Sequence, residues 1–167
     1  MVEKETIFSS RIKYNGIFSF KDLYKFCYDW LTEETGLLLV EEKYEEKLAG
    51  DAKEMKIDWV GTKKVTDYFK FEIKIRFILE KLTKIEITRD GAKVEANKGT
   101  VKIEVKGDLI RDYEGKFETT AFKKFLRSIY EKWVIPSRIE QYEDKIIEDC
   151  DEFLNQTKAY LDLEGKK

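Results

Sequence analysis

The chain of 167 residues contains no histidine, a single proline, and two widely separated cysteines, Cys27 and Cys150. The absence of histidine excludes Ser-His-Asp and Cys-His catalytic groups, as well as zinc, haem and non-haem iron sites that depend on imidazole. Neither cysteine has a CxxC partner, and both fall on apolar stripes, where a thiol is typical of a small core residue. Spacing alone leaves a disulfide between them open.

Long apolar runs and clustered arginines are also missing. No run approaches the roughly 18 residues that span a bilayer, and the charged residues 1–6 lack the features of a signal peptide. We therefore predict no membrane span and a cytoplasmic protein. The six arginines are scattered and the formal net charge is −2, so nucleic acid is not an expected partner. No Gly-rich phosphate loop occurs, and we predict no cofactor and no metal site.

Charged and apolar residues are abundant. Apolar residues make up 42% of the chain and aromatic residues 14%, which predicts a folded protein with a substantial core. Charged residues make up 40%, mostly Lys and Glu, a composition that resembles that of heat-adapted proteins. Because the chain has no internal repeat and no Gly/Ser/Pro linker, we predict that residues 1–167 form a single domain.

The first segment predicts a strand followed by a helix. Residues 6–14 alternate apolar and polar side chains and predict a strand that ends at Asn15-Gly16. Ser19 is placed to cap a helix, which Gly36 is expected to end. The apolar face of this helix consists of Leu23, Phe26, Cys27, Trp30 and Leu31.

From residue 37 to residue 112 the apolar residues alternate with charged ones, which is typical of strands with one buried face. Short connections predict a run of six antiparallel strands. Turns are expected at residues 50–51, 90–91 and 97–99, the second of these strands reaches Gly61, and Asp90-Gly91 is the strongest hairpin signal. In the first of these strands, four apolar residues stand among charges: Leu38, Val40, Tyr44 and Leu48.

The clearest strand covers residues 65–80. It would be about 50 Å long at the usual rise, so we expect it to bend strongly or to carry a bulge near Ile78. Its apolar face contains Phe69, Phe71, Ile73, Ile75, Phe77 and Leu79.

The last third predicts two helices on either side of Pro136. The first begins near Thr119 or Thr120 and has the apolar face Phe122, Phe125, Leu126, Ile129, Tyr130 and Trp133. The second opens on a capping-box pattern at residues 137–140, runs to Gly165, and is about 37 Å long. Its apolar stripe contains Ile139, Tyr142, Ile146, Cys150, Phe153 and Tyr160.

These elements predict an α+β fold, in which a curved antiparallel sheet of about seven strands packs on a long C-terminal helix, with one short helix after the first strand. Residues 1–118 would form the sheet and first helix, and residues 119–164 the two terminal helices. This order resembles the helix-grip fold of the START and Bet v 1-like (SRPBCC) superfamily over nearly the whole chain, but without a diagnostic motif. The resemblance implies that hydrophobic molecules such as lipids or sterols bind between sheet and helix. Pro136 departs from it, because the terminal helix of that fold is usually single.

The predicted inner face of the sheet contains no acid, base or nucleophile, so we predict a non-catalytic protein that binds an apolar small molecule. The paired carboxylates, such as Glu41-Glu42, are expected to be solvated because neighbouring strand residues point to opposite faces. Two alternatives stay open: a solid core without a cavity, and an interaction, homodimer or co-chaperone-like module that acts through residues 137–163. The predicted ligand-binding residues are Trp59, Phe71, Ile73, Ile75, Phe77, Ile103, Tyr142 and Ile146.

Overall fold

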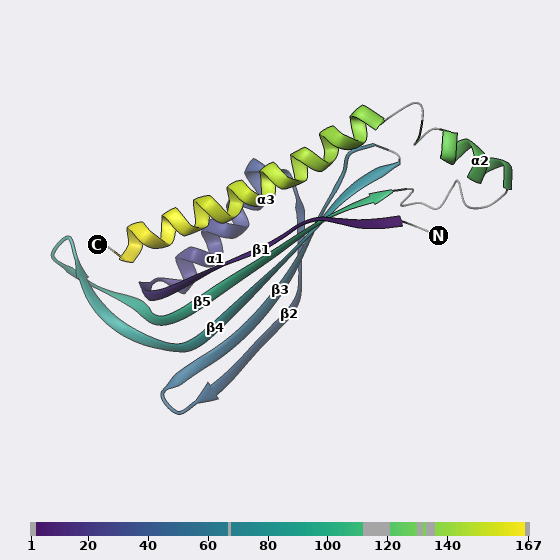
Figure 1. The fold of residues 1–167 in the computed structure, drawn as a ribbon. Coiled ribbons are helices and arrows are strands. Elements are labelled where there is room, and N and C mark those ends of the chain that lie inside the picture. The colour runs from purple at the N-terminus through teal and green to yellow at the C-terminus, as the bar shows by residue number, and fades with distance from the viewer. Residues whose placement is uncertain (1–2, 67, 112–120, 130–131, 133–135, 166–167) are drawn as a thin grey trace.

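A computed structural model describes residues 3–66, 68–111, 121–129, 132 and 136–165. These residues form an α+β fold with one antiparallel sheet, two helices on one of its faces and a third beyond its end (Figure 1). The elements, in chain order, are β1 (Glu3–Phe18), α1 (Phe20–Asp29), the π-helical turn η1 (Trp30–Glu34), β2 (Leu38–Ala49), β3 (Ala52–Lys64), β4 (Phe69–Arg89), β5 (Ala92–Arg111), α2 (Ala121–Ile129) and α3 (Pro136–Gly165).

The sheet has five strands in the order β1-β5-β4-β3-β2, and every neighbouring pair is antiparallel. It curves around the side that carries α1 and α3, which we call the inner face, and leaves an outer face opposite (Figure 1). The antiparallel order and the curvature agree with the sequence prediction. The prediction of about seven strands is wrong, because β4 and β5 are each a single long strand of 21 and 20 residues.

The turn expected at residues 97–99 does not form, and β5 runs straight through these positions. Asn97 has another role: its side-chain Oδ1 accepts the backbone N–H of Phe20 at 2.9 Å and so fixes the start of α1 to β5. Asn97 and Gly99 therefore do not mark a local turn. Each instead makes a contact with another element of the fold.

A bulge in β4 explains why Gly99 is needed. The register between β4 and β5 shifts between Glu80 and Thr83, and Lys81 takes a φ of 54°. A Cβ atom at Gly99 would lie 2.9 Å from the Lys81 carbonyl oxygen, so only glycine lets the two backbones approach this closely. The bulge expected near Ile78 exists but lies slightly further along the strand, at Lys81.

The N-terminal helix begins where the sequence predicts. Ser19 caps α1 by accepting the backbone N–H of Asp22 at 3.3 Å. The preceding strand is longer than expected, because β1 continues past Asn15-Gly16 to Phe18. After Asp29 the helix widens into η1, and Gly36 follows with a φ of 73°, a conformation that suits glycine.

The two C-terminal helices are also present, with bounds that differ in part from those predicted. Helix α3 begins at Pro136, a favourable first helical residue, which places Ser137 inside the helix rather than at its cap. Its length of 30 residues corresponds to about 45 Å. Helix α2 lies beyond the end of the sheet (Figure 1). Tyr130 and Trp133, predicted for its apolar face, lie outside the described residues.

Two helices share the inner face of the sheet. Helix α3 packs along β1 and β5, whereas α1 lies against α3 and covers part of β3 and β4. Phe26 of α1 stacks on Tyr160 of α3 at 4.5 Å between ring centroids, and Trp30 of η1 lies 5.6 Å from Phe153. The expectation that the terminal helix covers this face is therefore only partly correct. None of the helices among the described residues is long and apolar enough to cross a membrane.

Candidate functional site

The predicted ligand-binding residues all lie on the inner side of the fold, in one hydrophobic core. Seven of them are between 0% and 4% exposed, and Tyr142 is half-buried against the rings of Phe69 and Phe71. Trp59 and Ile75 also border a groove on the outer face, and the other six border neither that groove nor the inner hollow described below. The space between sheet and α3 is thus filled by side chains at the predicted position.

An aromatic cluster lies where α1 crosses the sheet. The ring of Tyr24 is 4.8 Å from Trp59 and 6.3 Å from Phe77, measured between centroids. Trp59 Nε1 donates to the Tyr24 hydroxyl at 3.3 Å, and this hydroxyl donates to Glu41 Oε1 at 2.5 Å. Burial, together with the hydrogen bond to Glu41, raises the pKa of Tyr24 to about 12, so the phenol stays protonated and serves as a structural donor.

Both cysteines are free and buried. Burial raises the pKa of each thiol to about 12, and the nearby carboxylate of Asp149 adds to the effect at Cys150. Cys27 lies 3.9 Å from the hydroxyl of Thr157 on α3. Both thiols are therefore protonated at neutral pH and act as small core residues, and neither has the character of a reactive nucleophile.

A hollow of about 780 Å³ opens on the inner face, between the start of α1 and the free ends of the β2-β3 and β4-β5 hairpins. We call it the inner hollow. Met55 and Leu82 form its apolar floor and are 3% and 5% exposed, while Phe20, Tyr44 and Leu48 form its wall. Its rim carries both signs of charge, from Lys21, Lys53, Lys84, Asp22, Glu46, Asp51 and Glu95.

A second hollow, of about 600 Å³, is a groove on the outer face. Charged side chains of both signs line it, among them Arg11, Asp58, Arg76 and Glu104. Arg76 donates two hydrogen bonds to Asp58, at 2.8 Å and 3.3 Å, and Arg11 lies opposite Glu104 in the register. Because charges of both signs line the groove, and Arg76 already pairs with Asp58, it favours neither an apolar molecule nor an ion of one sign.

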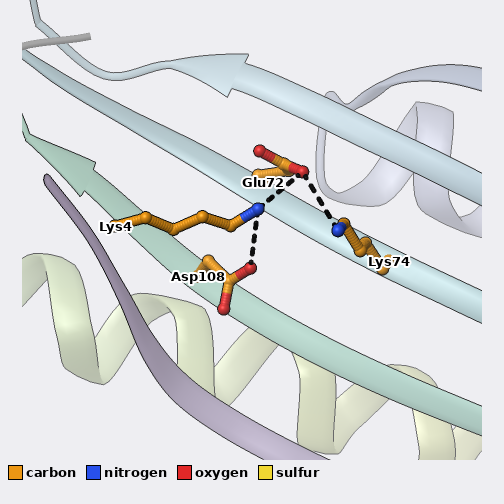
Figure 2. A network of polar contacts seen from close by, with 4 residues as sticks. All are labelled: Lys4, Glu72, Lys74 and Asp108. Atoms are coloured by element: carbon orange, nitrogen blue, oxygen red, sulfur yellow. Dashed lines mark hydrogen bonds and ion pairs between the residues drawn. The ribbon is translucent and has the colours of Figure 1, made fainter. Parts of the chain in front are cut away.

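A cluster of charges ties three strands together at one end of the outer face (Figure 2). Lys4 Nζ on β1 lies 3.1 Å from Glu72 on β4 and 3.4 Å from Asp108 on β5, and Lys74 lies 3.9 Å from Glu72. Asp108 is fully buried, so its charge requires a partner. Burial alone would lower the pKa of Lys4, but Glu72 and Asp108 outweigh it and raise that pKa. The cluster is a structural clamp between strands.

Among the described residues no group of three or more His, Cys, Asp or Glu side chains could hold a metal ion. The neighbouring carboxylates of β2 diverge: Glu45 pairs with Lys43, whereas Glu46 accepts the hydroxyl of Tyr44. These positions therefore offer no convergent pair of acids for acid-base chemistry.

Sequence reasoning missed the residues of the inner hollow. Phe20, the first residue of α1, and Leu82, just after the bulge where the alternation of β4 breaks, are not among the predicted ligand-binding residues. A usable signal existed at Tyr44 and Leu48, two large apolar residues four positions apart in a segment that is otherwise charged.

Comparisons of the chain with protein-family models, with curated proteins and with solved structures gave no match.

Proposed function

We propose that this protein is a non-catalytic binding module that holds an apolar small molecule in the inner hollow. The observation that carries the proposal is an apolar floor and wall, formed by Met55, Leu82 and Phe20, beside the start of α1. A hollow of about 780 Å³ falls within the range of small-molecule sites. The order of elements, which resembles that of the helix-grip superfamily, is consistent with this role.

The proposed position differs from the one expected from the sequence. The space between the sheet and α3 is occupied by side chains such as Phe77, Ile103 and Ile146, each with 0% exposure. A ligand there would have to push apart packed core side chains. Inserting extra atoms into a packed core in this way costs folding free energy. In the inner hollow, by contrast, a ligand would cover apolar groups that already face water, including Leu48, which is 73% exposed.

The experiment is native mass spectrometry on protein purified gently from its expression host, followed by titration with the apolar dye Nile red. We expect a retained small mass and saturable dye fluorescence. Phe20→Ser should weaken dye binding several-fold, whereas Phe26→Ser should not. The second variant is the matched control, since it truncates another phenylalanine of α1, one that stacks on Tyr160 away from the hollow. Absence of saturable binding, or equal loss in both variants, would refute the proposal.

A second candidate is an interaction module that acts through the C-terminal helices. The apolar stripe of α3 is already buried on its own sheet, but α2 exposes an apolar face: Phe122 (68%), Phe125 (59%), Leu126 (40%) and Ile129 (37%). The same helix presents the exposed lysines Lys123 and Lys124. An acidic amphipathic helix is the partner that complements both features.

This candidate is tested by fluorescence anisotropy with a labelled acidic amphipathic peptide. Binding that is lost in Phe125→Ser, and kept in Leu163→Ser at the exposed end of α3, would support it. Failure of the peptide to bind would remove it.

A further inference from the structure

The strand β2 forms an edge of the sheet. Among the described residues only β3 pairs with it, so the backbone N–H and C=O groups along its other side have no strand partner. The opposite edge, β1, is different because α3 packs along it. An edge strand of 12 residues is a template for another strand unless something blocks it.

A bulge divides this edge into two parts. The register between β2 and β3 shifts between Glu41 and Lys43, which makes Glu42 the extra residue. A bulge interrupts regular pairing on both sides of a strand. The longer of the two regular parts runs from Lys43 to Ala49 and offers the larger template for a new strand.

The side chains of this part have an unusual distribution. Tyr44 lies opposite Ile57 and so faces the inner side, as do Glu46 and Leu48, whereas Lys43, Glu45 and Lys47 face the outer side. Tyr44 is 48% exposed and Leu48 is 73% exposed. Two large apolar side chains thus face water in one row along an unpaired edge.

We propose that two copies of this chain associate by antiparallel pairing of their β2 strands, centred on Glu46. In this register Tyr44 lies opposite Leu48 of the second copy, and Glu45 lies opposite Lys47 of the second copy. Two-fold symmetry forms each of these pairs twice. Apolar and opposite-charge pairs across antiparallel strands are both stabilising.

Other registers are less favourable. Centring on Glu45 places that residue opposite its own copy and Lys43 opposite Lys47, which sets like charges together. Centring on Tyr44 leaves only residues 43–45 in regular pairing before the bulge is reached. The chosen register does bring two Glu46 side chains together, but each lies 2.9 Å from the Tyr44 hydroxyl and 3.9 Å from Lys53, which offset the repulsion.

The pairing does not depend on the proposed ligand. Tyr44, Glu46 and Leu48 also border the inner hollow, so the second copy would extend its open wall. The association is nevertheless measured on protein without dye, and it can fail or succeed independently of dye binding.

The test is sedimentation velocity of the whole chain over a wide range of concentrations. We expect a monomer-dimer equilibrium. Glu45→Lys places like charges opposite each other twice and should raise the dimer Kd at least about tenfold. Adding Lys47→Glu should restore the wild-type Kd. The charges at positions 45 and 47 are then swapped, so residues of opposite charge again face each other across the two copies.

The control is Glu45→Lys combined with Lys43→Glu. This combination restores only the 3.3 Å ion pair within one strand, so dimerisation should stay weak. Leu48→Ser should also weaken the dimer, whereas Leu38→Ser, an equally exposed leucine beyond the bulge, should not. A monomer at all concentrations, or a dimer that ignores the exchange of charges at residues 45 and 47, would overturn the proposal.

Discussion

At the scale of single residues, Gly107, near the C-terminal end of β5, decides how closely α3 approaches the sheet. A Cβ atom at Gly107 would lie 2.6 Å from Cγ2 of Ile146 and 3.0 Å from Sγ of Cys150. Both contacts are shorter than carbon-carbon and carbon-sulfur packing allows. The helix therefore rests on the backbone of β5 at this point rather than on a side chain.

We predict that Gly107→Ala destabilises the protein by about 1–3 kcal/mol, because the added methyl group overpacks the contact with α3. Urea unfolding followed by circular dichroism measures the change. In a double variant with Ile146→Ala, the two effects should be clearly non-additive, since the smaller side chain leaves room for the methyl group. A fully stable Gly107→Ala protein would show that α3 can shift without cost.

The burial of individual residues was predictable to a large extent. The alternation in β4 correctly placed Phe71, Ile73, Ile75 and Phe77 on the buried face. Their role as ligand-binding residues stays a prediction. The sequence could not show that Ile146 meets Gly107, because that contact depends on the path of two elements far apart in the chain.

At the scale of elements, α1 is specified by local chemistry at its start. Ser19 accepts a backbone N–H of the first turn, and Phe18 and Leu23, which flank this turn, are both 0% exposed. The carboxylate of Asp22 in the first turn also interacts favourably with the helix dipole. These features explain why the helix start agrees with the prediction.

We predict that Ser19→Ala lowers the free energy of unfolding by about 1 kcal/mol through loss of the cap. Ser19→Asp should keep most of the stability, because its carboxylate accepts the same N–H. Thermal unfolding of both variants provides the comparison. If the alanine and aspartate variants are equally destabilised, the cap is not what stabilises this helix start.

The composition of residues 97–99 shows where a local pattern fails to predict an element. Residues 97–99 have the composition of a turn, yet they lie within β5, where Gly99 accommodates the bulge at Lys81 and Asn97 holds the first N–H of α1. Local propensity for a turn is worth little beside several backbone hydrogen bonds of a long strand pair. Strand count was therefore overestimated although the strand pattern was correct.

At the scale of the whole molecule, burial of ionisable groups couples stability to pH. The pKa of Cys27 and of Cys150 is raised from 9.0 to about 12 in the folded protein. Between these values the unfolded chain loses thiol protons that the folded chain keeps. The folded state then binds more protons, so its stability falls as the pH rises.

We predict that the free energy of unfolding decreases above pH 9, by up to about 1.4 kcal/mol per pH unit for each cysteine. Tyr24, whose pKa is raised from 10.0 to about 12 by burial and by the hydrogen bond to Glu41, adds to this decrease above pH 10. Urea unfolding at a series of alkaline pH values measures the slope. In a variant with Cys27→Ala and Cys150→Ala, the free energy of unfolding should fall less steeply between pH 9 and pH 10. An unchanged slope would show that the two thiols do not cause the decrease.

The sequence by itself determined the spacing of apolar residues in each segment, the cap of α1, the start of a helix near Pro136 and the apolar character of one sheet face. Each of these depends on side chains that are neighbours in the chain or on the same strand. Only the tertiary structure decided that α1 and α3 divide the inner face, that the core fills the predicted ligand position, that a hollow stays open, and that within the described residues β2 pairs with β3 alone. These features arise because the bulge in β4, the glycines of β5 and the position of the helices set distances between segments far apart in sequence, which no local pattern encodes.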